Sequence, residues 1–248
     1  MARRYEQPPL IEALCEFVYE PDKEWDLTIP GLLYEKIKSE FPDKEQQMMV
    51  GVEFQIANGN LSQARPAPSL PKMIFRSSDK ASLVQVGAEL FAVNKLPIYS
   101  GWPIFRESVI KNAKIYREIT PSKKLKALTL RYINRVKVPT TSFDLDDYFN
   151  LVPKIPLGLS GPIVSFFVST RLASGSPKGV LTIIAAAENP GNESSFIFDF
   201  QFTSVGEDCP KTEAFEAWLD GAHAKISAGF DGTFSEKCHK DLFKEKHL

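Results

Sequence analysis

The chain has 248 residues and a formal net charge of −1. This near-neutral balance excludes the strongly basic overall field by which many nucleic-acid-binding proteins attract their ligand, but it leaves room for a local basic patch. A hydrophobic content of 43% and a charged content of 25% are typical of a globular protein that needs no metal or disulfide to hold its core.

The first half of the chain predicts two helices and four strands. The alternation of apolar and polar residues predicts strands at residues 10–20 and near 48–56, 72–77 and 83–93. Helical periodicity predicts helices over residues 28–41 and 102–119. The intervening segment 58–71 is rich in Gly, Ser and Pro, so we expect a long loop there.

The second half predicts a similar series of elements. A strand is expected at residues 125–138, followed by a short helix over 144–152, strands near 163–172, 180–187 and 195–204, and a helix from Lys211 to about Phe230. Residues 174–179 and 189–194 are predicted to be hairpin connections. The tail after residue 234 is expected to add a helical turn or to stay loose.

A faint repeat supports this parallel between the halves. The segments PDKEWDL at 21–27 and PTTSFDL at 139–145 share a proline, an aromatic residue and Asp-Leu at the same spacing. Asp26 and Asp144 are predicted to cap the helix that follows each segment. We therefore predict two β-α-β-β-β-α units, at residues 1–122 and 123–232, and a C-terminal tail at residues 233–248.

The strand pattern also predicts how the two units pack. Phe196, Phe198, Phe200 and Phe202 share one face of a strand whose other face is largely polar. Such alternation is typical of an antiparallel sheet that is covered on one side only. We therefore predict an α+β fold in which both units form one curved antiparallel sheet with the helices on one face, as in a saddle or helix-grip arrangement. Two separate α+β domains are the alternative.

Two apolar stripes should form the cover of that sheet. The helical spacing of their residues predicts core positions rather than cofactor contacts. The stripes are Phe105, Val109, Ala113 and Tyr116 in the helix at 102–119, and Phe215, Trp218, Leu219, Ala222, Ile226 and Phe230 in the helix that starts at Lys211.

Cysteine usage and apolar run length bear on the location of the protein. Cys15, Cys209 and Cys238 are an odd number without a CxxC pair, which argues against a disulfide framework and favours a reducing cytoplasm. The basic start MARRYEQPPL is not followed by the apolar core of a signal peptide. The longest apolar runs fall far short of the ~20 residues that span a membrane. We expect a cytoplasmic protein without a membrane partner.

Motifs that carry known chemistry are missing from the sequence. It contains no GxGxxG or GxxxxGK[ST] phosphate loop, no GxSxG elbow and no HExxH. Cys238, His239 and His223 have a spacing that matches no common zinc site. Cys15 lies within a strand, where a buried structural thiol is expected. The sequence therefore predicts no metal and no cofactor.

The strand LRYINRVKV, residues 130–138, carries an asparagine on its apolar face and a basic stripe on the other face. Asn134 either ties down a loop or caps a helix, or it belongs to a polar site shared between the two halves. Arg131, Arg135 and Lys137 form the basic stripe.

Two strand registers are open for these residues. Aligning Pro21 with Pro139 makes Glu16 equivalent to Asn134 on the helix-facing side and places Phe17 and Tyr19 beside the basic stripe. In a different register, Glu12 and Glu16 face Arg131 and Arg135 as cross-strand ion pairs.

Several motifs, in a fixed order along nearly the whole chain, resemble those of a sporadically distributed bacterial protein family of unknown function. They are PPLIEALCEF, LVQVGAELFAVNKLPIYSGWPIF, LRYIN and WLDGAHAKISAGF. The resemblance implies no reaction, and its patchy distribution suggests mobile elements or antiviral defence. The hallmark positions are Pro9, Glu12, Glu16, Asn94, Tyr99, Trp102, Arg131, Tyr132 and Asn134.

Three functions follow as hypotheses. The first is a non-catalytic binding or regulatory protein that contacts a protein partner or a small ligand, with a homodimer as a further expectation. The second is a nucleic-acid-binding component that uses a basic and aromatic sheet face. The third is an enzyme that uses Glu12, Glu16 and an arginine. The candidate binding residues are Glu12, Glu16, Asn94, Tyr99, Trp102, Arg131, Asn134 and Arg135.

Overall fold

A computed structural model gives the fold of the chain. It describes residues 3–20, 25–47, 51–57, 60–67, 72–97, 99–120, 124–139, 143–156, 158–159, 163, 165–188, 194–211 and 214–246. For residues 51–57 and 60–67 it describes the backbone only.

Eleven strands and four α-helices make up the described chain. The strands are β1 (Leu10–Tyr19), β2 (Asp43–Gln47), β3 (Gly51–Ala57), β4 (Asn60–Ala67), β5 (Lys72–Arg76), β6 (Ser82–Val86), β7 (Leu90–Lys95), β8 (Leu125–Val138), β9 (Phe167–Gly175), β10 (Lys178–Glu188) and β11 (Ser194–Val205). The helices are α1 (Ile29–Ile37), α2 (Trp102–Ile119), α3 (Leu145–Tyr148) and α4 (Phe215–Thr233). Short helical turns lie before α4, at Gly206–Asp208, and after it, at Cys238–Leu242.

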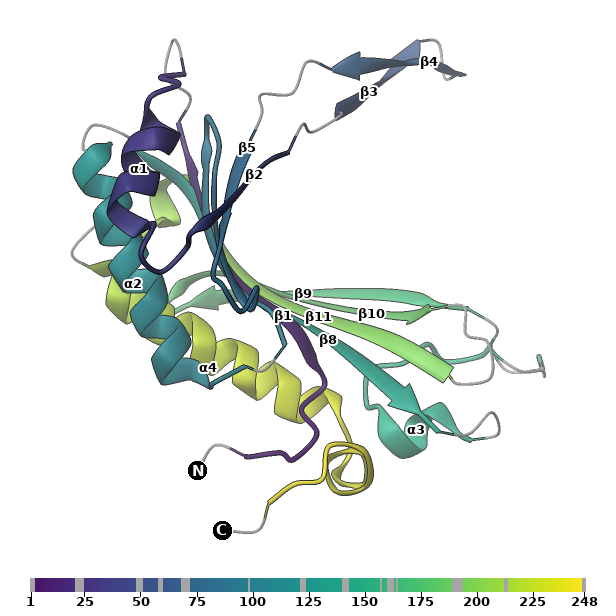
Figure 1. Cartoon of the computed structure of the whole chain (residues 1–248). Coiled ribbons are helices and arrows are strands. Elements are labelled where there is room, and N and C mark those ends of the chain that lie inside the picture. Colours follow the sequence, from purple (N-terminus) through teal and green to yellow (C-terminus); the bar gives the residue numbers. More distant parts are fainter. Residues whose placement is uncertain are drawn as a thin grey trace.

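Nine of the strands form one antiparallel open sheet in the order β2-β5-β6-β7-β1-β8-β11-β10-β9. Strands β1 and β8 meet at its centre, and β2 and β9 are its edges. The sheet is strongly curved, and the strands β3 and β4 pair with each other in a separate hairpin beyond its upper end (Figure 1). The prediction of one broad antiparallel sheet, rather than two separate domains, is therefore confirmed.

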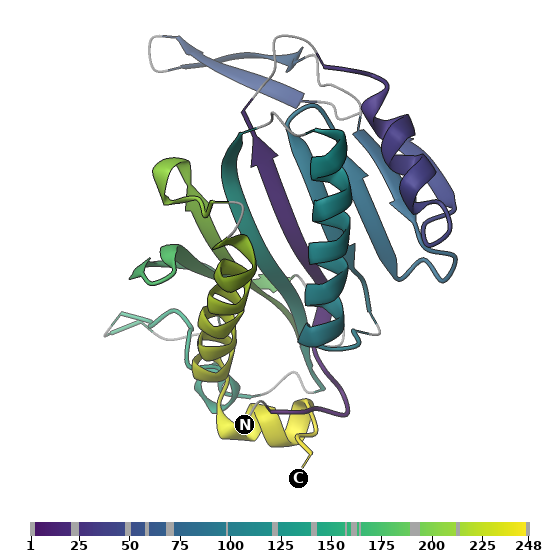
Figure 2. The ribbon, with the colours of Figure 1, turned by 90° about the vertical axis from the view of Figure 1, so that its left-hand side faces the viewer.

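Helices α1, α2 and α4 all lie against the convex face of the sheet (Figures 1 and 2). The core fills the space between them and the strands, because alternate strand residues point into it. The phenylalanines of β11 are all buried there, as are the predicted stripe residues Val109, Tyr116, Leu219 and Ala222. Each buried phenylalanine, valine or leucine among them stabilises the fold by roughly 1.5–3 kcal/mol. The polar alternate positions form a concave face on the other side.

The predicted strands and helices agree with the structure at most positions. The strand at residues 125–138 and the helix at residues 102–119 have the predicted boundaries. The predicted connection at residues 174–179 links β9 to β10 in register. Asp144 caps α3 by accepting a hydrogen bond from the Asp146 amide. The connection at residues 189–194 and Pro21 lie largely outside the described residues.

Three expectations about the elements were wrong, and one strand was missed. The predicted strand at 83–93 is a hairpin, because Gly87 and the two residues after it turn the chain, and the Gly87 amide bonds to the Leu90 carbonyl at 2.8 Å. The predicted loop at 58–71 contains β4, which pairs with β3. The edge strand β2 was not predicted. The predicted strand at 163–172 begins four residues later, at Phe167.

The two ends of the chain pack against each other. Tyr5 forms a β-bridge with Glu245, and the Tyr5 hydroxyl lies 2.8 Å from Nδ1 of the buried His239. Arg3 pairs with Glu236 and Glu245 at 2.5 and 2.8 Å. The tail is thus an ordered part of the fold, which agrees with the predicted terminal helical turn. No helix in the described part of the chain combines the length and apolar character required to cross a bilayer.

Candidate binding surface on the concave face

The strands β1, β7 and β8 place five of the eight candidate residues on the concave face. Residue burial alternates along most of β8 and from Cys15 to Tyr19 of β1, and the pairing of the two strands places the remaining residues of β1. Odd-numbered residues of β1 and even-numbered residues of β8 point into the core, and the others point to the concave side. The candidate residues on the concave face are Glu12 and Glu16 of β1, Asn94 of β7, and Arg131 and Arg135 of β8.

The register of β1 and β8 surrounds Arg131 with acidic residues. Arg131 lies opposite Leu14, so Glu12 and Glu16 flank it diagonally on the neighbouring strand. The pKa of Arg131 is raised above its usual value, mainly by its hydrogen bonds to Asp199 and in smaller part by the charges of Glu12 and Glu16.

This arrangement decides between the two registers that the sequence left open. The Pro21–Pro139 alignment is wrong in placing Glu16 on the helix-facing side with Asn134. The alternative is correct that Glu12 and Glu16 share a face with Arg131. Their direct partners, however, are Ile133 for Glu12 and Thr129 for Glu16.

Arg131 and Asp199 form an ion pair on the concave face that is joined by hydrogen bonds from two nitrogens of the guanidinium. The Arg131 Nε lies 2.9 Å from Asp199 Oδ1, and Nη2 lies 2.6 Å from Oδ2. The Asp199 side chain is only 6% exposed, whereas that of Arg131 is 37% exposed. The Gln201 amide also reaches Asp199 Oδ2, at 3.4 Å. The buried carboxylate therefore depends on Arg131 for its compensation.

A second set of hydrogen bonds continues across the other half of the sheet. Lys72 Nζ donates to Gln85 Oε1 at 2.7 Å, and Gln85 Nε2 donates to Asn94 Oδ1 at 2.8 Å. Asn94 Nδ2 then donates to Glu12 Oε1 at 2.6 Å. Asn94 is buried, and both its amide oxygen and its amide nitrogen are hydrogen-bonded within this chain of side chains, as buried polar atoms usually are.

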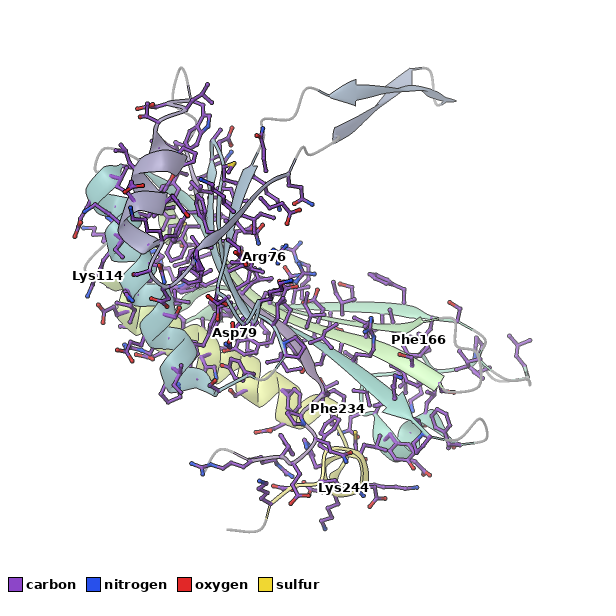
Figure 3. The ribbon with its side chains drawn as sticks, in the orientation of Figure 1. Arg76, Asp79, Lys114, Phe166, Phe234 and Lys244 are labelled. Atoms are coloured by element: carbon purple, nitrogen blue, oxygen red, sulfur yellow. The ribbon has the colours of Figure 1, made fainter. Side chains whose placement is uncertain are left out.

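We call these seven residues the concave network: Lys72, Gln85, Asn94, Glu12, Arg131, Asp199 and Gln201. They come from six adjacent strands, β5, β6, β7, β1, β8 and β11. Arg76 of β5 continues the same face and pairs with Glu45 of β2 at 3.3 Å (Figure 3). The concave face is thus a fixed array of alternating charges and amides, in which hydrogen bonding holds each side chain in one orientation.

The aromatic residues expected beside the basic stripe lie elsewhere. Phe17 and Tyr19 are on the core side of β1, at 4% and 3% exposure, and Phe17 contacts Phe91 and Phe215. The expectation that they interleave with Arg131 and Arg135 is therefore wrong. Asp199 shares the face of the basic stripe and neutralises part of its charge.

Asn134 is buried on the core side, as the sequence pattern predicted. Its amide donates to the carbonyls of Tyr132 and Phe198, both at 3.3 Å. It is thus satisfied within the sheet, rather than by capping a helix or holding a loop. Arg135, the next residue, is exposed at the end of the concave face, and its backbone amide bonds to the Pro9 carbonyl at 2.9 Å.

The other two candidates, Tyr99 and Trp102, lie on the helix side of the sheet. The Tyr99 hydroxyl is 2.9 Å from that of Tyr132, and the Trp102 ring stacks on His223 with centroids 4.1 Å apart. Burial lowers the pKa of His223 to about 4, so the stacked imidazole is neutral at pH 7. This aromatic cluster joins α2 to α4 and to β8, and it is separate from the concave network.

Sequence reasoning missed several members of the network. Lys72, Gln85 and Gln201 are ordinary polar residues at strand positions, and only the strand order brings them into contact. The available signal was their alternation with buried neighbours, which places them on the polar face but does not identify their partners. His223, which the sequence offered only as a poor zinc ligand, stacks on Trp102 instead.

The described residues were also searched for a metal site and for a reactive cysteine. Among them, no three His, Cys, Asp or Glu side chains are grouped as metal ligands. All three cysteines are free, and Cys15 and Cys238 are buried. Burial raises the pKa of the Cys15 thiol well above its usual value, which agrees with the predicted structural role.

The chain matches no protein-family model, and a search of curated proteins finds no match either. The functional inference therefore depends on the residues and their geometry.

Proposed function

We propose that the protein is a non-catalytic binding protein and that the concave face of its sheet is the surface that contacts a protein partner. The single observation that carries this proposal is the concave network. Seven polar side chains from six strands are oriented by one another on a face that no described helix covers (Figure 1). An ordered polar surface loses little conformational entropy when a partner binds to it.

The charge pattern of this face favours a protein as the partner. Lys72, Arg131 and Arg76 alternate with Glu12, Glu16 and Asp199, so neither sign dominates. Charge arrays of this kind give specificity toward a complementary polar surface. A nucleic-acid backbone instead requires a continuous excess of cations.

A nucleic acid is the second candidate, and one observation favours it. Phe167 of β9 is 70% exposed and lies in the same cross-strand row of the concave face as Arg135. Arg171, four residues along β9, is exposed on that face as well. This end of the sheet therefore offers one stacking surface and cations, in place of the stacking expected from Phe17 and Tyr19.

The enzyme hypothesis stays a prediction with less support. Glu12 accepts a hydrogen bond from Asn94, and both Glu12 and Glu16 lie beside Arg131, so each has a role in organising the concave face. A role in a mobile-element or antiviral defence system, and a cytoplasmic location, depend on the family resemblance and on composition. The identity of neighbouring genes would test the first of these.

We also propose that the sheet arose from two tandem units, at residues 1–122 and 123–232, followed by the tail at 233–248. The strand order supports this, because β1, β7, β6 and β5 follow one another on one side of the centre as β8, β11, β10 and β9 do on the other. Strand β2 and the β3–β4 hairpin are then additions to the first unit.

The concave network supports the same proposal. Leu14 pairs with Asn94, and Ile133 pairs with Asp199. Glu12, two positions before Leu14, accepts a hydrogen bond from Asn94, and Arg131, two positions before Ile133, donates one to Asp199. The two halves therefore share the same diagonal contact. We expect that in a crystal structure a single rotation superposes β1, β7 and α2 on β8, β11 and α4. A rotation that matches the strands and leaves the helices apart would contradict the duplication.

Two matched variants test the binding proposal. The concave variant is Arg135→Glu with Arg171→Glu, which changes exposed residues outside the concave network. The control variant is Lys225→Glu with Lys240→Glu, which makes the same charge change at exposed positions outside the concave face. Each variant is first checked for a wild-type circular dichroism spectrum and melting temperature.

The tagged proteins are then used for affinity capture from a lysate of the source organism. We expect the wild type and the control variant to retain the same protein and the concave variant to lose it. Capture by all three alike, or capture of nothing above bare resin, would overturn the proposal. A gel shift with single- and double-stranded DNA and RNA is run in parallel. A salt-sensitive shift that only the concave variant loses would favour the nucleic-acid alternative.

A further inference from the structure

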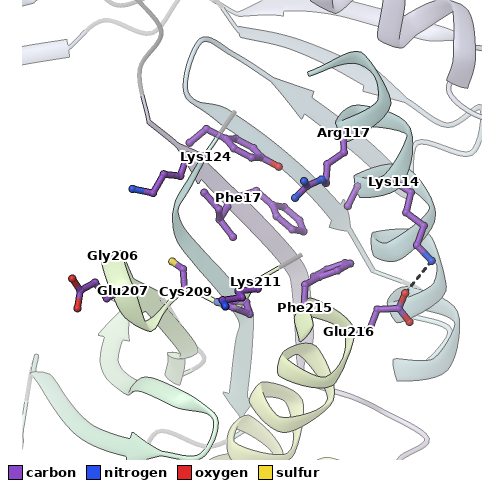
Figure 4. A pocket seen from close by; sticks show the side chains of 14 residues that line it. Phe17, Lys114, Arg117, Lys124, Gly206, Glu207, Cys209, Lys211, Phe215 and Glu216 are labelled. Carbon is purple, nitrogen blue, oxygen red and sulfur yellow. Dashed lines mark ion pairs between the residues drawn. The ribbon is translucent and has the colours of Figure 1, made fainter. Parts of the chain in front are cut away.

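A cavity of about 600 Å³ lies on the convex side of the sheet, between α2 and the start of α4 (Figure 4). It is separate from the concave network, because it is reached from the opposite face of β1 and β8. Its volume is within the range of sites for small organic ligands. Every residue that lines it belongs to the described chain.

The floor of the cavity is aromatic. Phe17 and Tyr19 come from β1 and Phe215 from the first turn of α4, and the rings of Phe17 and Phe215 lie 5.7 Å apart in an edge-to-face arrangement. Ala113 and Leu125 complete the apolar part of the lining. Such a floor suits the flat face or edge of an aromatic ring.

The rim of the cavity carries more cations than anions. Lys114, Arg117, Lys124 and Lys211 line it, against Glu207 and Glu216. This local excess of positive charge contrasts with the net charge of −1 of the whole chain.

Two of these cations are already neutralised and two are available. Lys114 pairs with Glu216 at 2.9 Å, and Lys124 pairs with Glu20 at 3.0 Å. For Arg117 and Lys211, no carboxylate of the described residues lies within ion-pair distance.

Arg117 acts directly on the aromatic floor. Burial raises the pKa of Tyr19, and the positive charge of Arg117 opposes that increase, so the guanidinium lies near the phenol. Figure 4 shows the Arg117 side chain directed from α2 toward Phe17. An arginine held over an apolar surface binds a carboxylate or a phosphate through two parallel hydrogen bonds.

From this geometry we infer that the cavity binds a small aromatic anion. The ring packs against Phe17 and Phe215, and the acidic group is held by Arg117 and Lys211. A neutral apolar ligand would fit this cavity less well, because Arg117 and Lys211 would then lose water without gaining a partner.

The test uses 8-anilinonaphthalene-1-sulfonate, an aromatic anion whose fluorescence increases on binding. The wild type is titrated beside Arg117→Glu with Lys211→Glu and beside the control variant Lys225→Glu with Lys240→Glu. We expect one saturable site in the wild type and the control, and at least a tenfold loss of affinity in the Arg117/Lys211 variant. Equal affinity in all three proteins would overturn the inference.

Two further measurements separate charge from apolar attraction. The neutral analogue N-phenyl-1-naphthylamine is expected to bind weakly and with the same affinity to all three proteins. A loss of its binding in the Arg117/Lys211 variant would mean that the cavity had collapsed, and Arg117→Gln alone then replaces that variant. Competition by phenyl phosphate and by benzoate identifies whether a phosphate or a carboxylate is preferred.

Cys209 provides an independent readout at the same cavity. It is a free, half-buried cysteine in the lining, whereas Cys15 and Cys238 are fully buried. Iodoacetamide should therefore alkylate Cys209 first in the folded protein, and a saturating concentration of the aromatic anion should slow that reaction at least threefold. Unchanged alkylation in the presence of the bound anion would place the anion elsewhere and overturn the assignment.

Discussion

The ion pair between Arg131 and Asp199 gives the sharpest test of the concave face, because its two members differ in exposure. Asp199 is 6% exposed and Arg131 is 37% exposed. Replacing Arg131 with methionine leaves a buried carboxylate whose only other described donor is the Gln201 amide at 3.4 Å. Replacing Asp199 with asparagine leaves an arginine that water can reach. The first change should therefore destabilise the fold more than the second.

The magnitudes follow from the bonds that are lost. Arg131→Met removes two charged donors, Nε and Nη2, each worth about 1.5–3 kcal/mol to the carboxylate before solvent exposure of the arginine is considered. Partial hydration of the uncovered carboxylate reduces this to a net loss of about 2–4 kcal/mol in the free energy of unfolding. Asp199→Asn keeps one acceptor for Arg131 and should cost about 1 kcal/mol. The double variant should cost at least 1 kcal/mol less than the sum of the single changes.

Urea unfolding, followed by far-ultraviolet circular dichroism and by tryptophan fluorescence, measures these differences. Arg171→Met is the matched control, since it removes an exposed arginine from the same face and should change the free energy of unfolding by less than about 0.5 kcal/mol. The reasoning is refuted if Arg131→Met costs no more than Arg171→Met, or if the effects of the two single changes simply add.

Three further predictions concern other parts of the fold. Glu12→Ala should cost about 1–3 kcal/mol because it leaves the buried Asn94 amide without its acceptor, whereas Glu16→Ala should cost less than about 0.5 kcal/mol; urea unfolding compares them. The lowered pKa of His223 means that the unfolded chain takes up a proton between about pH 6.5 and pH 4 while the folded chain does not, so stability falls as the pH falls through that window. His223→Phe should reduce that fall in unfolding titrations at pH 7 and pH 4.5, and equal falls would contradict the assignment. Gly179→Ala should cost about 2 kcal/mol or more, because the Gly179 φ is +154° and a Cβ there would lie 2.7 Å from the Phe202 ring; a melting temperature within 1–2 °C of wild type would rule this out.

The alternation of residues was enough to predict most of the strands, and its failures have specific physical causes. The strand at 125–138 alternates over its whole length, so its ends were predictable. Strand β2, DKEQQ, is exposed at every position because it is an edge strand, and it offers no apolar pattern to recognise. The turn at Gly87 lies inside an apolar run, so the two strands that it connects were read as one.

The face of a strand was harder to predict than its existence. The Pro21–Pro139 alignment assumes that both central strands contain the same number of residues before the proline. In β1 one residue, Glu20, separates the core-facing Tyr19 from the proline, whereas in β8 the core-facing Val138 directly precedes Pro139. One additional residue in a strand reverses which side chains face the core, so a repeat alignment placed Glu16, Phe17 and Tyr19 on the wrong faces. The contacts of the concave network required the strand order, which no local pattern contains.

This same alternation keeps the two proposed binding regions experimentally separate. Glu16 and Phe17 are neighbours in β1, yet Glu16 points to the concave face and Phe17 forms the floor of the cavity between α2 and α4. The concave variant changes Arg135 and Arg171, and the cavity variant changes Arg117 and Lys211, so no substituted residue is shared. Loss of partner capture with intact binding of the aromatic anion, or the reverse, would therefore assign each function to one face of the sheet. Loss of both in either variant would instead indicate that the variant had disturbed the central strands that the two faces share.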